Sequence, residues 1–504
     1  MSTSSRVIKN TGYLYVKMGI TMFVSLYTTR LILASLGASD FGVFNVVGGA
    51  IAMLGFLNST LANATQRFMS YTEGQGQMGK KRQIFNVSLV LHLLIAAVTV
   101  VLLLAAMYPF FHGIFNIEPD RVFAAKVVYL SLIFSTFLTI VNVPYDAVMN
   151  AHENMLYYSV IGILESLLKL AVALIVVHSS SDKLILYGLL MACIPLITLS
   201  IMKAYCHRRY EECVIAPRRY WDGALVRQIA GFFGWNFLTA ISSLLSAQGI
   251  GIVLNHFFGS VLNAAQGVAN QVNGVLSNFS ANMMKALNPV ITKSAGAGDI
   301  DAMNRASIAG CKFSALLTML FGIPLSIEVH YVLGVWLKDV PDWAAVFVVL
   351  QLVQSIIVQM AASASTAVYA QGDIKQYAIW KSVMNAMPLI LTWIAFRMGG
   401  GPIWLYIPMI IVWAIGGDVV IVHYARKNCG LEVSEYLNKV VLPLSGTAVI
   451  MLAFGVASYY LLEPGFVRLV VTCAATTLGM SVALIAFATT REERSMFKGL
   501  LKKD

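Results

Sequence analysis

The chain has 504 residues, of which 58% are hydrophobic and only 12% are charged, and its formal net charge is +11. A soluble domain carries roughly 25% charged residues, so this composition excludes an ordinary soluble protein. Apolar runs of about 20 residues are long enough to cross a bilayer core as helices. The alternating pattern of a membrane β-barrel is absent.

The sequence therefore predicts an all-α integral membrane protein with about 14 transmembrane helices, because backbone groups in hydrocarbon must bond within their own segment. Turn and charge signals place the spans, in chain order, near 11–36, 41–72, 84–111, 122–148, 156–178, 183–204, 229–257, 263–292, 308–336, 344–370, 378–397, 402–424, 440–462 and 466–489.

A weak internal repeat organises these spans. A shift of about 222 residues places Leu36-Gly37 on Phe258-Gly259 and aligns two segments rich in Asn and Ser. A shift of six spans keeps the orientation, which predicts two pseudo-symmetric six-helix lobes related by an axis normal to the membrane. The predicted domains are an N-terminal lobe (1–204), a basic cytoplasmic linker (205–228), a C-terminal lobe (229–424), and two extra helices with a cytoplasmic tail (425–504).

Basic residues set the predicted orientation. About 23 of the 35 Lys and Arg residues fall in loops on the N-terminal side of the membrane, and about 6 fall in the opposite loops. Both termini are therefore expected in the cytoplasm. The net positive charge needs no nucleic acid to explain it, since anionic headgroups attract the same loops. The basic segment 203–228 is alternatively a docking site for a cytoplasmic partner.

The remaining six basic residues lie inside predicted spans, where an isolated charge costs roughly 2.5–3.5 kcal/mol on insertion scales. Lys169 follows Glu165 by four residues, which predicts an intrahelical ion pair, and Lys312 is expected at the membrane interface. Arg30 and Arg67 either face a cavity or snorkel to headgroups. Lys17 and Lys285 lie deepest, with no acid at i±3 or i±4, and are the strongest candidates for cavity cations.

Polar stripes accompany these cations on one face of each of four helices, which predicts a polar cavity. Each stripe combines Asn, Gln, Ser or Thr at helical spacing, and three of the four have a cation on or beside them. The stripes comprise Asn10, Lys17, Thr21 and Thr28; Ser59, Asn63, Gln66 and Ser70, beside Arg67; Asn236, Thr239, Ser243 and Ser246; and Gln271, Asn278, Asn282 and Lys285.

The chain resembles the polysaccharide and O-antigen flippases of the multidrug/oligosaccharidyl-lipid/polysaccharide exporter superfamily. The likeness lies in NTGYLYVKMGITMFVSLYTTRLILASLGASDFGVFNVVGG (Asn10–Gly49), NATQRFMS (Asn63–Ser70), VPYDAVMNAHENM (Val143–Met155) and GVWL (Gly334–Leu337), and in the architecture of two lobes plus two helices. None of these motifs is a short diagnostic signature.

The resemblance implies a flippase of the bacterial inner membrane that moves an undecaprenyl-pyrophosphate-linked oligosaccharide to the outer leaflet by alternating access. Polysaccharide polymerase and glycosyltransferases would be its candidate partners, and no cofactor or metal is expected. The site would lie between the lobes. Lys17, Arg67 and Lys285 would bind the headgroup, with Arg30 as an outward-side partner, and Asn63, Gln66, Gln271, Asn278 and Asn282 would bind sugar hydroxyls. The lipid II flippase has arginines in its central cavity, whereas this chain has Lys17 and Lys285.

Two other functions stay open. A cation-coupled multidrug exporter of the same superfamily needs a buried acid, and the acids considered within spans are Glu165, Glu328 and Asp418. An integral-membrane polymerase or glycosyltransferase is expected to carry a larger outer loop, paired carboxylates or a metal motif. The eight His lack metal-ligand spacing, and no HExxH, GxSxG, P-loop or CxxC occurs. The sequence therefore favours a transporter over an enzyme.

Overall fold

The computed structural model describes residues 3–52, 55–114, 117–337 and 339–489, and it is all-helical over these ranges. Within these ranges, twelve stretches are long and apolar enough to cross a membrane. One of them, α8 (Gly223–Gly296), has 74 residues and breaks at Gly259, so it supplies two spans. The predicted span 41–72 is not among these stretches and stays a prediction; it coincides with the part of α1 (Thr3–Ala52) beyond Gly37 and with α2 (Gly55–Gln75), and its residues 53 and 54 lie outside the described residues. The prediction of an all-α membrane protein is confirmed.

The chain divides into two compact units, and the boundary along the sequence lies within α8, between Gly234 and Trp235. The first unit, from Arg6 to Gly234, is called the N-terminal lobe here, and the unit that continues from Trp235 is called the C-terminal lobe. Each is described by itself. The finer division into a linker and a separate C-terminal pair of helices stays a prediction.

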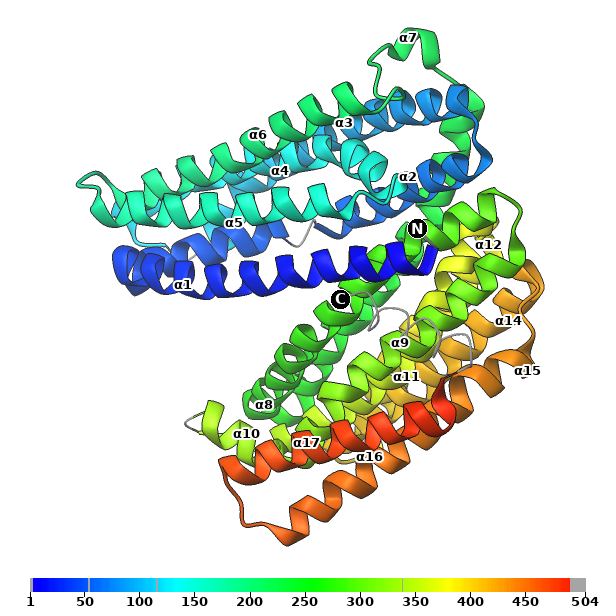
Figure 1. Ribbon diagram of the computed structural model, residues 1–504. Coiled ribbons are helices and arrows are strands. Elements are labelled where there is room, and N and C mark those ends of the chain that lie inside the picture. Colours follow the sequence, from blue (N-terminus) through cyan, green and yellow to red (C-terminus); the bar gives the residue numbers. More distant parts are fainter. Residues whose placement is uncertain (1–2, 53–54, 115–116, 338, 490–504) are drawn as a thin grey trace, which may run out of the picture. The chain divides into compact units, whose positions relative to one another are not determined.

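The N-terminal lobe contains α1, α2 and the start of α8. Between them lie α3 (Met78–Pro109), α4 (Val122–Ala151), α5 (Met155–His178), α6 (Lys183–Arg209) and the short α7 (Pro217–Tyr220). The helix α4 is central, because α2, α3 and α6 all pack against it (Figure 1). Gly188 allows α6 to approach closely, since a Cβ atom at this position would lie 2.9 Å from Val128 of α4.

The C-terminal lobe contains α9 (Ile300–Ile327), α10 (Val329–Trp336), α11 (Ala344–Gln371) and α12 (Lys375–Arg397). A helical stretch of several turn types then runs from Pro402 to Cys429 and ends in α14 (Gly417–Cys429). The last elements are α15 (Val433–Tyr436), α16 (Leu442–Leu461) and α17 (Phe466–Ala483). Figure 1 shows α16 and α17 side by side, and both also pack against α9.

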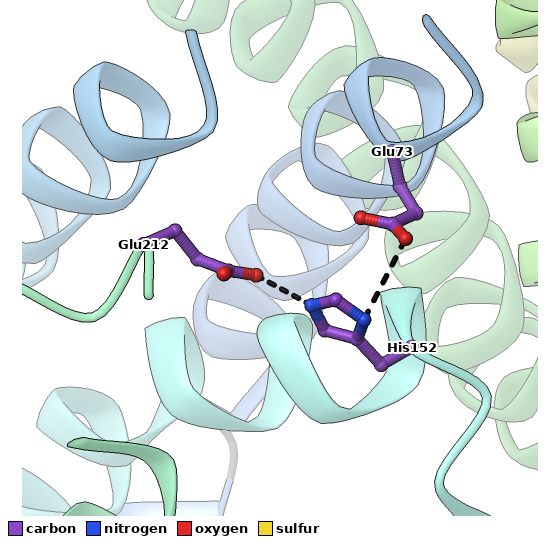
Figure 2. Close-up of side chains that lie close together, drawn as sticks. All are labelled: Glu73, His152 and Glu212. Atoms are coloured by element: carbon purple, nitrogen blue, oxygen red, sulfur yellow. Dashed lines mark hydrogen bonds and ion pairs between the residues drawn. The ribbon is translucent and has the colours of Figure 1, made fainter. Parts of the chain in front are cut away.

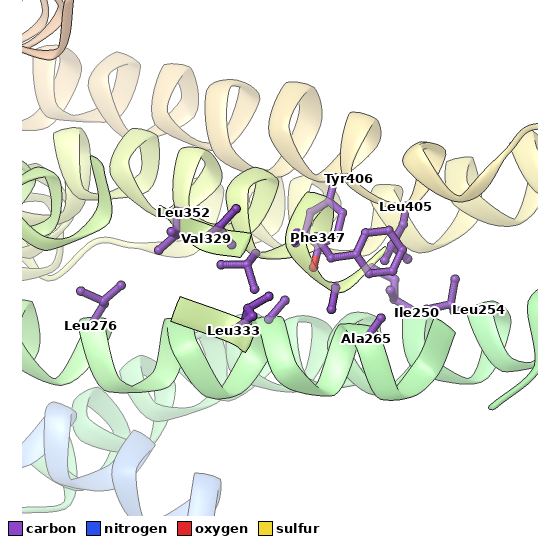
Figure 3. Packing of buried hydrophobic residues seen from close by; sticks show 14 of the residues in the cluster. Ile250, Leu254, Ala265, Leu276, Val329, Leu333, Phe347, Leu352, Leu405 and Tyr406 are labelled. Carbon is purple, nitrogen blue, oxygen red and sulfur yellow. The ribbon is translucent and has the colours of Figure 1, made fainter. Parts of the chain in front are cut away.

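A hydrophobic cluster holds the C-terminal lobe together (Figure 3). Ile250 and Leu254 come from α8 before its break, and Ala265 comes from α8 beyond it. They pack with Phe347 of α11 and with Tyr406. Because residues on both sides of the break enter one cluster, packing fixes the two halves of α8 against each other.

The predicted repeat is visible in the backbone. Gly37 has φ 76° and ψ 170°, and Gly259, 222 residues later, has φ 80° and ψ −170°. This region of conformational space is essentially restricted to glycine. Helix starts repeat with the same interval, since α9 begins 222 residues after α3, and α11 begins 222 residues after α4. Both lobes therefore share one helix order, as the sequence predicts.

An ionic cluster joins three helix ends in the N-terminal lobe. The Arg121 guanidinium forms ion pairs with Asp40 and with Asp182, at 2.8 Å from Asp182 Oδ2. Burial alone would raise the pKa of Asp182, but hydrogen bonds from Arg121 and from the backbone N–H groups of Ile185 and Leu184 lower it below its ordinary value. All three residues lie at the predicted outer side, so the cluster fastens α1, α4 and α6 there.

The break at Gly259 generates a test. Gly259→Ala is expected to lower the free energy of unfolding by about 1–3 kcal/mol, because alanine rarely adopts this backbone conformation. Gly267→Ala is the matched control: it lies in the same helix without a positive φ, and a Cβ atom at either position meets nothing within 4 Å. Thermal unfolding in detergent measures the difference. Equal midpoints for the two variants would contradict the assignment.

Candidate functional site

Lys17 is positioned by contacts with α5. Its Nζ lies 4.3 Å from the ring centroid of Tyr158, and its side chain is half-buried. Gly162, one turn further along α5, leaves room for the lysine stem, because a Cβ atom there would lie 2.7 Å from Nζ. A cation over an aromatic face is stabilised by about 0.5–2 kcal/mol, most where water is excluded. The structure thus holds this ammonium within a membrane span.

Asp146 is an acid within a predicted span that the sequence analysis did not consider. Asp146 of α4 accepts a hydrogen bond from Asn142 Nδ2 at 3.3 Å. Tyr158 lies within electrostatic reach of Lys17, Asp146 and Glu165. A search restricted to i±3 and i±4 could not find Asp146, which is on another helix. Its place in the VPYDAVMNAHENM segment was the available signal.

Arg67 of α2 is surrounded by aromatic rings. Its guanidinium carbon lies 4.6 Å from the Phe68 ring centroid, 4.8 Å from that of Tyr71 and 5.5 Å from that of Phe232 in α8. All four residues belong to the N-terminal lobe. Planar guanidinium groups stack on aromatic faces while their edges keep hydrogen-bonding capacity. The arrangement presents a rigidly held cation rather than a flexible one.

The other predicted site residues differ in exposure. Arg30, Asn63, Gln271 and Asn278 are exposed, whereas Gln66, Asn282 and Lys285 are half-buried. Asn282 donates from Nδ2 to the Asn278 backbone carbonyl at 2.9 Å, so these two share one helical face. The first group of predicted cations, Lys17, Arg30 and Arg67, belongs to the N-terminal lobe, and Lys285 belongs to the C-terminal lobe. Their joint role in one site stays a prediction.

Some members of the polar stripes have structural roles within their own lobe. Asn10 is buried and donates from Nδ2 to the Glu153 carbonyl at 3.1 Å, which fastens the start of α1 to the segment after α4. Thr28 and Ser70 are buried as well. In the C-terminal lobe the Thr239 carbonyl accepts a hydrogen bond from Asn385 Nδ2 at 3.2 Å. A polar stripe therefore does not by itself identify a cavity wall.

Two intramembrane acids form ion pairs. The predicted pair is confirmed, since Lys169 Nζ lies 2.7 Å from Glu165 Oε1. Glu328 lies 2.9 Å from Arg468 Nη2, and its second oxygen accepts a hydrogen bond from Thr472 at 3.0 Å. The Glu328 and Arg468 side chains are 0% and 7% exposed. This buried pair attaches α17 to the end of α9.

The remaining acid considered from the sequence, Asp418, lies beside Lys381. The lysine, counted from the sequence among the inner-loop cations, is inside α12 and is the charge that acts on Asp418. The Lys381 Nζ also lies close to Gly417, the residue before Asp418 in α14. A Cβ atom at Gly417 would lie 2.5 Å from this Nζ. Asp418 Oδ1 is buried and has no hydrogen-bond partner among the described residues. The C-terminal lobe thus carries a partly satisfied acid–base pair.

Lys312 is buried inside the C-terminal lobe. Its exposed fraction is 1%, and its expected position at the membrane interface stays a prediction. The reason for the burial is tertiary: α9, which carries Lys312, is packed against α11, α16 and α17. A position that looks peripheral along the sequence is therefore enclosed by protein.

Comparisons with known proteins place the fold. No protein-family profile and no curated protein matches the sequence significantly. Solved structures do match: a MATE in the bent conformation has a TM-score of 0.69 at 14% identity, over 89% of this chain and 98% of that one. A multidrug resistance MATE transporter of the MOP superfamily, in an outward-facing conformation, has a TM-score of 0.71 at 13% identity, over 85% and 96%.

A third solved structure is a MOP superfamily transporter from Pyrococcus furiosus, described as having a binding pocket of reverse polarity that suggests a different function. Its TM-score is 0.67 at 14% identity, over 85% of this chain and 96% of that one. At such identities the likeness shows the fold, which is that of MATE-type membrane transporters.

The Glu328–Arg468 pair generates a test. Arg468→Met leaves a buried carboxylate without its partner, so stability is expected to fall by about 3–5 kcal/mol. Lys439→Met is the control, because the Glu435–Lys439 pair is exposed at 32% and 46%, and such pairs contribute about 0–1 kcal/mol. Thermal unfolding in detergent measures both. A control variant that destabilises as much as Arg468→Met would contradict the assignment.

Proposed function

We propose that this protein is a membrane transporter that flips an anionic, pyrophosphate-linked oligosaccharide lipid from the inner to the outer leaflet by alternating access. The observation that carries the proposal is the pair of cations held inside spans of the N-terminal lobe on aromatic rings, Lys17 on Tyr158 and Arg67 among Phe68, Tyr71 and Phe232. A pyrophosphate in hydrocarbon needs cations to replace its water.

The two cations suit different parts of such a headgroup. An ammonium acts as a point charge, and a guanidinium binds phosphate oxygens in a bidentate manner. Contacts with aromatic rings restrict both side chains, so less conformational entropy is lost when the headgroup binds. The described pocket of the Pyrococcus furiosus transporter supports the proposal, because it indicates that pocket polarity varies within this fold.

The second candidate is a cation-coupled multidrug exporter, favoured by Asp146 and Asp418. Asp146 lies in a span of the N-terminal lobe, and the buried Oδ1 of Asp418 has no hydrogen-bond partner within the described part of the chain. Acids within spans commonly bind protons or cations in transporters. Lys17 and Asp146 both act on Tyr158, and Lys381 lies beside Asp418, so a lysine accompanies each acid and weakens its attraction for a cationic drug.

Deleting the gene in a host with a known surface glycan tests the proposal. Surface polymer is expected to disappear while lipid-linked repeat units accumulate on the cytoplasmic side, because the headgroup cannot cross unaided. Immunoblots of surface glycan and mass spectrometry of extracted lipids measure the two quantities. Normal surface glycan together with new sensitivity to cationic drugs would reject the flippase and support the second candidate.

Gly162→Ala tests the position of the Lys17 ammonium. The added methyl group overlaps the end of the lysine side chain, which must leave Tyr158, while alanine favours helix α5 itself. Export is expected to fall about tenfold, equivalent to about 1.4 kcal/mol, with membrane abundance and thermal stability unchanged. Gly19→Ala is the matched control, because a Cβ atom there meets nothing within 4 Å. Normal export by Gly162→Ala would remove Lys17 from the mechanism.

A further inference from the structure

Three side chains of metal-ligating type converge at the predicted cytoplasmic end of the N-terminal lobe (Figure 2). Glu73 lies near the end of α2, His152 follows α4, and Glu212 belongs to the turn after α6. One ligand atom from each residue lies within 4.8 Å of the others. The three positions are far apart along the sequence, so local spacing could not have revealed the cluster.

The imidazole stands between the two carboxylates. His152 Nε2 lies 2.5 Å from Glu212 Oε1, and His152 Nδ1 lies 3.6 Å from Glu73 Oε1. The Glu212 side chain is 1% exposed, whereas those of Glu73 and His152 are 18% and 23% exposed. The cluster is therefore closed on the Glu212 side and open to solvent on the other, which gives an ion a path of entry.

Neighbouring residues hold these side chains in orientation. Lys81 Nζ lies 2.5 Å from Glu73 Oε2, which leaves Oε1 directed at the imidazole. The Tyr210 ring stacks on His152 with centroids 4.3 Å apart and planes 10° apart, and the Tyr210 hydroxyl accepts a hydrogen bond from Asn154 at 3.0 Å. Such surrounding contacts are typical of metal sites, where they fix ligand orientation.

The charges of the cluster leave one negative charge to be balanced. Glu73 and Glu212 supply two carboxylates, and Lys81 supplies one ammonium. The flanking acids have their own partners, since Glu153 lies 3.9 Å from Arg6 and Glu211 lies 3.8 Å from Arg82. A divalent cation would change this net charge from −1 to +1, so the remaining carboxylate charge attracts such an ion.

We propose that Glu73, His152 and Glu212 form a binding site for a divalent first-row transition-metal ion such as Zn²⁺. One imidazole nitrogen and two carboxylate oxygens are a ligand set that zinc accepts, with a fourth position left for water. The imidazole favours a transition metal over Mg²⁺ or Ca²⁺, which prefer oxygen ligands alone. The ion would replace the direct contact between His152 Nε2 and Glu212, and the Glu73 carboxylate, which faces His152 Nδ1, would turn to complete the ligand set.

A metal at this position would fasten three segments of the N-terminal lobe. It would join the end of α2, the end of α4 and the connection that follows α6. Asn86 of α3 already holds this connection, because its side chain accepts a hydrogen bond from Ala216 N and donates one to the Val214 carbonyl, both at 2.8 Å. The site includes neither Lys17 nor Arg67, so it is independent of the proposed cargo.

Isothermal titration of the full-length protein with ZnCl₂ tests the proposal. The protein is purified in detergent without a polyhistidine tag and is first stripped with a chelator. One ion per chain is expected to bind, and saturating Zn²⁺ is expected to raise the thermal midpoint of the wild type, since a ligand that binds only the folded state stabilises it. Absence of Zn²⁺ binding by the wild type would overturn the proposal, whatever the variants do.

Three variants assign the site. His152→Ala and Glu212→Gln are each expected to weaken Zn²⁺ binding by at least about 100-fold, since outer-shell changes alone cost 10–100-fold. His207→Ala is the matched control, because His207 lies at the end of α6 and contacts Tyr145 rather than the cluster. Unchanged Zn²⁺ affinity in His152→Ala, or an equal loss in His207→Ala, would overturn the assignment.

Discussion

The cost of placing charge and unpaired backbone in hydrocarbon is the constraint on which the rest of the structure depends. It requires helices throughout the spans, and it requires each intramembrane charge to find a partner. Glu328 and Arg468 show the result most clearly, because both are almost fully buried and their hydrogen bonds attach α17 to α9. An isolated charge would be unfavourable in lipid, but these two paired charges join two helices.

The same constraint explains the surroundings of the other charges within the spans. Lys169 is matched by Glu165 on its own helix, whereas Lys17 and Arg67 rest on aromatic rings. An aromatic face lowers the cost of burying a cation without neutralising it. The proposed function depends on these two cations more than on the polar stripes, because stripe residues such as Asn10 form hydrogen bonds within their own lobe.

Glycine geometry explains how one sequence supplies two similar lobes. Gly37 and Gly259 interrupt their helices with nearly the same backbone dihedral angles, and the helices that follow begin at matching intervals. Identity between the two halves is low, yet the break persists because few other residues adopt that conformation. A backbone requirement can therefore preserve a repeat after most side chains have diverged.

The sequence by itself determined the spans, the two-lobe repeat and the Glu165–Lys169 pair. These depend on apolar run length, on glycine at a fixed interval and on spacing within one helix, all of which are local. Only the tertiary structure decided that Lys312 is enclosed, that Lys17 and Asp146 both act on Tyr158, that Lys381 lies beside Asp418, and that Glu73, His152 and Glu212 converge. Each of these relations joins different helices or the ends of helices distant in the chain. Hydrophobic periodicity shows that a helix packs against something, but it does not specify which helix supplies the partner of a buried charge.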